Sequence, residues 1–96
     1  MIQAWPTKDP SANLRYWFDW SAFVEGEESE IVSYEISLDS PPDNALLIGN
    51  HAREDNVVMV WISGGTLGKL YHVRCRITLA DGTIEDESRG LVIRQH

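Results

Sequence analysis

Hydrophobic and polar residues alternate with a period of two along much of this chain, which is typical of β-strands with one buried face. The clearest alternation covers residues 71–79, where Tyr, Val, Cys, Ile and Leu are separated by His, Arg, Arg and Thr. A second alternation covers residues 32–39, with Val32 at the start of the apolar face. Each segment is predicted to be an antiparallel strand whose other face meets water.

Two further segments predict strands of a different kind. Residues 14–20 are rich in aromatic side chains, which favour strands, and their alternation places Trp17 on the face opposite to Tyr16 and Phe18. Residues 57–62 form an unbroken apolar run. Both faces of this strand are therefore expected to be covered, one by the core and the other by a partner or by the N-terminal segment.

The remaining segments are shorter or richer in turn residues. Additional strands are predicted at residues 45–48, 83–86 and 91–94, a polar turn-rich stretch at residues 49–56, and a single helical turn at residues 21–26 that Ser21 caps and Gly26 ends.

Glycines mark the predicted corners of the fold. The run at residues 63–68 is expected to use Gly64, Gly65 and Gly68 as structural turn residues, because a tight corner needs positive φ angles. Asp81 and Gly82 predict a type I′ hairpin. Residues 88–90 predict a β-bulge, where Gly90 would relieve the backbone.

Six or seven short strands without a crossover helix exclude a parallel sheet. The pattern predicts an all-β protein with an immunoglobulin-like or fibronectin III-like antiparallel β-sandwich, and a small barrel is the alternative. Residues 14–96 are expected to form this single domain. Residues 1–13 are expected to form an extended N-terminal arm, since Pro6 and Pro10 favour extended backbone.

Composition narrows the range of partners. The 96 residues suffice for one core, and 15 acidic against 8 basic residues give a net charge of −7. Such a surface repels phosphate, so neither nucleic acid nor an anionic membrane is an expected partner. No signal peptide is apparent, and a lone cysteine, Cys75, closes no intrachain disulfide. Synthesis and folding in a reducing cytoplasm are expected.

The sequence offers only weak candidates for catalytic and metal-binding residues. The three histidines, His51, His72 and His96, lack the spacing of a zinc site, and Cys75 faces inward on its predicted strand. The acidic runs at residues 27–30 and 85–87 are better explained as solvated turns and edges than as calcium ligands. The sequence therefore predicts no catalytic, cofactor-binding or metal-binding residue, no cofactor, and no enzyme.

The chain has four tryptophans, more than a core of this size requires. Trp17 and Trp61 fall on faces opposite to core positions, and Trp5 lies in the arm. Because tryptophan is enriched at the energetic centres of protein interfaces, these three residues are candidate contact residues. The alternative is that the arm folds back and covers Trp17 or Trp61 within one chain.

Several of these segments together resemble the small phage fibre-tail adaptor proteins. The shared features are a Trp-x-x-Lys-Asp-Pro arm, an aromatic strand that ends in Asp-Trp, and a Ser-Gly-Gly-Thr-x-Gly-x-x-Tyr corner; they occur here at residues 5–10, 16–20 and 63–71. A strand and a glycine hairpin follow, as in that family. The strand at residues 71–79 is also similar to the penultimate strand of fibronectin type III domains.

The resemblance implies a virion structural protein that is made in the host bacterial cytoplasm and joins phage tail or connector proteins to tail fibre protein, in several copies around the tail axis. The expected protein-interface residues are Trp5, Pro6, Lys8, Asp9, Pro10, Trp17 and Trp61. Exposed tryptophans also suit a small carbohydrate- or protein-binding module, which is the alternative function; a small enzyme is a third hypothesis.

Overall fold

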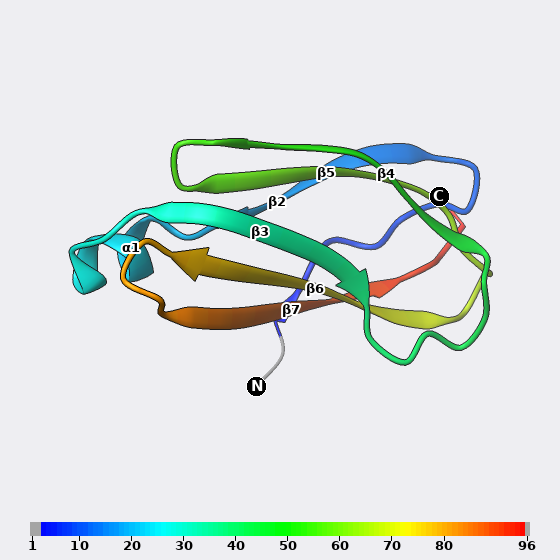
Figure 1. The fold of residues 1–96 in the computed structure, drawn as a ribbon. Helices are drawn as coiled ribbons and strands as arrows, with labels where there is room; N and C mark the ends of the chain where they lie inside the picture. Colours follow the sequence, from blue (N-terminus) through cyan, green and yellow to red (C-terminus); the bar gives the residue numbers. More distant parts are fainter. Residues whose placement is uncertain (1–2, 96) are drawn as a thin grey trace.

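Two β-sheets packed face to face form the protein in the computed structural model, which describes residues 3–95 (Figure 1). The strand order is β1-β7-β6-β3 in one sheet and β2-β5-β4 in the other, and only β1 and β7 pair in parallel. The elements are β1 (Gln3–Ala4), β2 (Asn13–Asp19), α1 (Ser21–Glu27), β3 (Ile31–Leu38), β4 (Leu46–Glu54), β5 (Val57–Gly64), β6 (Leu70–Leu79) and β7 (Ile84–Val92). The predicted all-β, immunoglobulin-like sandwich is confirmed.

The core lies between the sheets and is built from alternate residues, as the period of two requires. The inward residues of β6 are at most 1% exposed: Tyr71, Val73, Cys75, Ile77 and Leu79. They face the inward residues of the second sheet, which include Phe18, Val58, Val60 and Ile62, each 0% exposed. The alternation predicted for residues 71–79 is therefore confirmed.

β3 departs from the predicted alternation at its first residues. Ile31 is buried, whereas Val32 is 57% exposed, and the register with β6 shifts between Ile31 and Ser33. The placement of Val32 on the apolar face was wrong because a bulge reverses the alternation there. Beyond the bulge, Tyr34 and Ile36 pack against the core as predicted.

β4 is longer than its sequence indicates. It runs through most of the stretch predicted to be polar and turn-rich, as far as Glu54. β4 is an edge strand that pairs with β5 alone, so most of its side chains face solvent and carry no apolar alternation. The register shifts between Ile48 and His51, so that Gly49 and Asn50 form a bulge.

α1 is a helix of 7 residues rather than a single turn. The N-cap residue is Trp20, without a side-chain cap, and the helix ends at Glu28 in the left-handed conformation. The predicted Ser21 cap and Gly26 end were therefore wrong. The carboxylate of Asp19 accepts a hydrogen bond of 3.0 Å from the Ser21 N–H and orients the start of the helix instead.

The β6–β7 hairpin has a three-residue loop, not the predicted type I′ turn. The N–H of Gly82 donates to the Leu79 carbonyl at 3.0 Å, and Gly82 has a φ of +92°. Type I′ requires positive φ at both central residues, whereas the φ of Asp81 is not positive. The loop is a tight turn followed by a left-handed glycine, in which the Asp81 carboxylate accepts a hydrogen bond from the Thr83 N–H at 2.9 Å.

The predicted bulge at residues 88–90 is absent. The register of β6 with β7 is continuous from Leu70 and Val92 to Thr78 and Ile84. Gly90 is instead buried where β1 lies alongside β7, in register with Ala4. Its lack of a side chain accompanies the close approach of a second strand.

The glycine corner, residues 63–68, links β5 to β6 and has the positive φ angles that were predicted. These are +73° at Gly64, +99° at Gly65 and +83° at Gly68. The hydroxyl of Tyr71 accepts a hydrogen bond of 2.9 Å from the Thr66 N–H, five residues upstream. This arrangement is the tyrosine corner of immunoglobulin-like sandwiches.

The Tyr71 hydroxyl also donates to the carboxylate of Asp43 at 2.6 Å. A second oxygen of that carboxylate accepts a hydrogen bond of 2.7 Å from the Thr66 hydroxyl. The bonds from Tyr71 and Thr66 favour the charged form and lower the pKa of Asp43. The long loop between β3 and β4 is thus tied to the glycine corner.

We expect the substitution Tyr71→Phe to lower the free energy of unfolding by about 1–3 kcal/mol, because it leaves partners of a buried hydroxyl unsatisfied. Urea titration measures the change. Tyr34→Phe is the matched control, since among residues 3–95 the Tyr34 hydroxyl bonds only to the exposed His51 ring, at 2.8 Å. A loss at Tyr34 as large as that at Tyr71 would contradict a structural role for the corner.

Candidate protein interface

The N-terminal arm lies along β7. β1 pairs in parallel with β7, and the N–H of Trp5 continues the pairing with a hydrogen bond of 2.9 Å to the Gly90 carbonyl. Further along, the N–H of Lys8 donates to the Val92 carbonyl at 3.1 Å. The arm expected over residues 1–13 is therefore held against the sandwich from residue 3 onward; residues 1–2, like His96, lie outside the described residues.

The side chain of Lys8 is fully buried and anchors the arm to the glycine corner. Its amine donates hydrogen bonds of 2.7 Å to the Gly64 carbonyl and 2.8 Å to the Asp9 carbonyl. Burial lowers the pKa of Lys8, and the nearby Asp9 charge partly opposes this shift. Because the amine lies inside the chain, Lys8 presents no surface to a partner in this conformation.

Asp9 and Pro10 are partly buried and shape the turn that returns the arm to β2. The Asp9 carboxylate accepts hydrogen bonds from both the N–H and the hydroxyl of Ser11, at 2.8 and 2.7 Å. These are local bonds that stabilise a turn. Two of the expected contact residues therefore act within the chain here.

Trp5 covers one side of the sandwich. Its ring stacks on Tyr16, with 4.6 Å between ring centroids, and meets the edge of Phe18 at 5.1 Å. The arm thus folds back onto inward-facing residues of β2. It leaves Trp17 and Trp61 uncovered, with exposed fractions of 54% and 41%.

The outer face of the β3-β6-β7 sheet is largely polar and carries one ion pair among the described residues. Arg76 forms a two-pronged ion pair with Asp86, at 2.8 and 3.1 Å, and lies opposite Glu35 on β3. Arg74 lies between Ser37 and Ser88 in the ladder. This face is suited to water.

The outer face of the β2-β5-β4 sheet is different, and we call it the tryptophan face. It comprises Arg15, Trp17, Ala52, Met59 and Trp61. In the ladder Trp17 lies opposite Met59, Met59 opposite Ala52, and Arg15 opposite Trp61. Trp17 and Trp61 are therefore diagonal neighbours, close enough to form one aromatic patch. Tryptophan and arginine are the residue types that dominate the energetic centres of interfaces.

Arg15 is an unpaired cation between these two tryptophans. Among residues 3–95 it has neither an ion pair nor a hydrogen-bond partner. The nearest acid on the same face of β2, Asp19, is occupied by Ser21, whose hydrogen bonds lower the pKa of Asp19. In a chain of net charge −7, an unpaired guanidinium at an aromatic surface is a ready partner for an external carboxylate.

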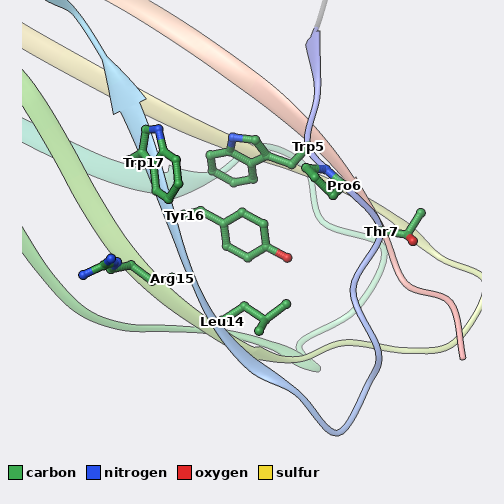
Figure 2. A pocket seen from close by; sticks show the side chains of 7 residues that line it. All are labelled: Trp5, Pro6, Thr7, Leu14, Arg15, Tyr16 and Trp17. Carbon is green, nitrogen blue, oxygen red and sulfur yellow. The ribbon is translucent and has the colours of Figure 1, made fainter. Parts of the chain in front are cut away.

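A groove of about 380 Å³ lies between the arm and β2 (Figure 2). We call it the arm groove; its lining residues are Trp5, Pro6, Thr7, Leu14, Arg15, Tyr16 and Trp17. The Tyr16 ring lies between the two walls with its hydroxyl directed toward the arm. That hydroxyl is buried and has no hydrogen-bond partner among the described residues, and burial raises the pKa of Tyr16.

The structure thus brings together Trp5, Pro6 and Trp17 in one groove, with Trp61 on the adjoining tryptophan face. Sequence reasoning did not single out Arg15 and Tyr16. The available signal was that Arg15 shares the outward face of its strand with Trp17, two residues further along. The groove itself has no local signal, because it depends on how the arm folds back.

Candidate metal-binding and catalytic groups are sparse among the described residues. Within residues 3–95, no three side chains of the types that bind metals come together as a possible site. No described helix has the length and apolar character needed to cross a membrane. Cys75 is buried, and burial raises the pKa of its thiol to about 11. A thiol of this kind is protonated at neutral pH and is a poor nucleophile.

Comparison with known proteins gives one result. A family model described as podophage GP4 fiber-tail adaptor protein gp77 matches residues 8–92, which is most of the chain. The match begins at Lys8 and includes the glycine corner, the tryptophan face and the β2 side of the arm groove. No curated protein matches the chain.

The raised pKa of Cys75 predicts a loss of stability at alkaline pH. The folded state favours the protonated thiol. The contribution of this preference to the free energy of unfolding is complete below pH 9 and is lost as pH rises toward 11. We expect the loss to reach about 2 kcal/mol by pH 11. Urea titrations between pH 8 and 11 should show a shallower pH dependence for Cys75→Ala, and identical slopes would contradict the prediction.

Proposed function

The chain belongs to the podophage fiber-tail adaptor family, so it is a structural component of a phage tail, and we propose that it joins the tail or connector proteins to the tail fibre protein. Several copies assemble around the tail axis after synthesis in the host cytoplasm. The role is mechanical attachment without catalysis.

The observation that carries this proposal is the contrast between the two outer faces of the sandwich. One face is polar and pairs Arg76 with Asp86. The tryptophan face exposes Trp17 and Trp61 around an unpaired Arg15. Exposed tryptophan area beside an arginine is typical of the energetic centres of specific protein interfaces.

The expected contact residues divide into two groups under this proposal. Trp17, Trp61 and the exposed Pro6 contact neighbouring proteins, and Trp5 contributes the edge of its ring at the arm groove. Lys8 and the turn that follows it hold the arm in position. The acidic surface keeps the chain away from nucleic acid and anionic membranes.

Immunogold labelling of intact particles of the phage that encodes the chain tests the proposal. We expect gold at the tail, concentrated where fibres attach, because an adaptor is a permanent part of that junction. Mass spectrometry of the same particles measures whether the chain is present. Particles that contain none of it would contradict the adaptor function.

The substitution Trp61→Ser tests the tryptophan face. We expect at least about a thirtyfold weaker incorporation into particles, because truncating a central interface tryptophan costs about 2 kcal/mol or more. The measurement is the amount of this chain relative to the major capsid protein. Ile84→Ser is the matched control, since Ile84 is 60% exposed on the opposite sheet, and equal losses from both variants would contradict the prediction.

A further inference from the structure

The free edge of β2 differs from the other free edges of the sandwich. β3 and β4 each carry a bulge, where the register shifts next to Ser33 and His51, and β1 has only 2 residues. Short edge strands and bulges are the devices by which proteins prevent unwanted strand pairing. β2 has neither, because its register with β5 is continuous over all 7 residues.

The backbone groups that face this open edge can be assigned from the register. The N–H of Trp20 donates to the Asn56 carbonyl at 2.8 Å, so Trp20 directs its backbone groups toward the β5 side. In an antiparallel ladder every second residue does the same. The intervening residues, Arg15 and Trp17, therefore direct their N–H and carbonyl groups away from β5, toward the arm groove.

The arm does not occupy this edge. Its N–H groups at Trp5 and Lys8 donate to β7, and no described backbone bond joins the arm to Arg15 or Trp17. The groove between arm and strand remains open and is lined in part by Tyr16, whose buried hydroxyl has no hydrogen-bond partner among the described residues (Figure 2). A free strand edge, an apolar groove and an unsatisfied buried hydroxyl thus coincide in one place.

We propose that an extended segment of a neighbouring tail or fibre protein adds to β2 as a further strand, with apolar side chains in the arm groove and a carboxylate beside Arg15. The inference rests on the proposed adaptor function and specifies how one partner is held. Main-chain hydrogen bonds to Arg15 and Trp17 supply affinity, and alternate side chains supply specificity.

Charge selects this occupant over a second copy of the chain. Pairing of β2 with β2 of a second copy brings two Arg15 guanidinium groups onto one sheet and joins two chains of net charge −7. Like charges close together on one face of a sheet repel each other. A partner segment that carries an acidic residue meets Arg15 with the opposite charge and pairs its guanidinium.

Competition between variants inside the host tests the proposal. Cells supply equal amounts of the wild-type chain and either Arg15→Pro or Arg15→Thr, and mass spectrometry measures their ratio in purified particles. Both variants lose the guanidinium, but only proline also removes the N–H at the open edge. We expect Arg15→Pro to be incorporated about tenfold less than Arg15→Thr, the effect of one backbone hydrogen bond.

The outcomes separate this inference from the function on which it rests. Equal incorporation of the proline and threonine variants would overturn strand addition, while the wild-type chain in the particles would still support the adaptor role. Absence of the wild-type chain from particles would overturn both. Proline at the open edge removes no bond to β5, so the midpoint of thermal unfolding should match that of the threonine variant.

If Arg15→Pro does not fold, hydrogen exchange of the wild-type chain tests whether a strand adds to β2. The amides of Arg15 and Trp17 should exchange rapidly in the free chain and at least about tenfold more slowly in assembled particles, because a new backbone bond protects them. Unchanged exchange at both amides would overturn the proposal.

A photo-crosslinker identifies the occupant. The variant Leu14→p-benzoylphenylalanine places the reactive group at the mouth of the arm groove, where Leu14 is 41% exposed. We expect it to trap, in assembled particles, a peptide of another tail or fibre protein that contains an acidic residue. A trapped peptide from a second copy of this chain would overturn the assigned occupant.

Discussion

The burial of the Lys8 amine against the Gly64 carbonyl is the constraint on which the functional surface depends. An ammonium group removed from water must find hydrogen-bond acceptors, and here they lie on the glycine corner, 56 residues away along the chain. This contact fixes where the arm runs. The arm in turn places Trp5 on Tyr16, and so creates one wall of the arm groove. Sequence reasoning assigned Lys8 to the surface as a contact residue, whereas its side chain is buried and holds the arm in place.

The glycine corner also fixes the loop between β3 and β4. Tyr71 joins the glycine corner to Asp43, so the loop between β3 and β4 and the arm are both attached to one short segment. One outer face is polar and pairs Arg76 with Asp86, whereas the other exposes Trp17 and Trp61. That division suits a protein whose task is attachment.

The parts of this structure that follow from local pattern were predictable. The strand at residues 71–79 alternates because one face meets the core, and the outward positions of Trp17 and Trp61 follow from the same rule. β4 was underestimated because an edge strand with two wet sides has no apolar period. The bulge that exposes Val32 and the hairpin at Asp81 depend on strand register, which no single segment specifies. The arm groove depends on contacts between residues far apart in the sequence.

The open edge of β2 leaves backbone N–H and carbonyl groups unpaired, and strand addition in the assembled tail pairs them. Unpaired backbone groups beside an apolar groove invite association, and soluble monomers generally suppress them. The free edges of β3 and β4 carry bulges and β1 is very short, so among the described strands β2 differs in having a long, regular free edge. The exception also lies beside the one unpaired arginine of the tryptophan face and beside a buried hydroxyl without a partner. A protein that works only in an assembled tail can leave such an edge unprotected, because its neighbour completes the sheet.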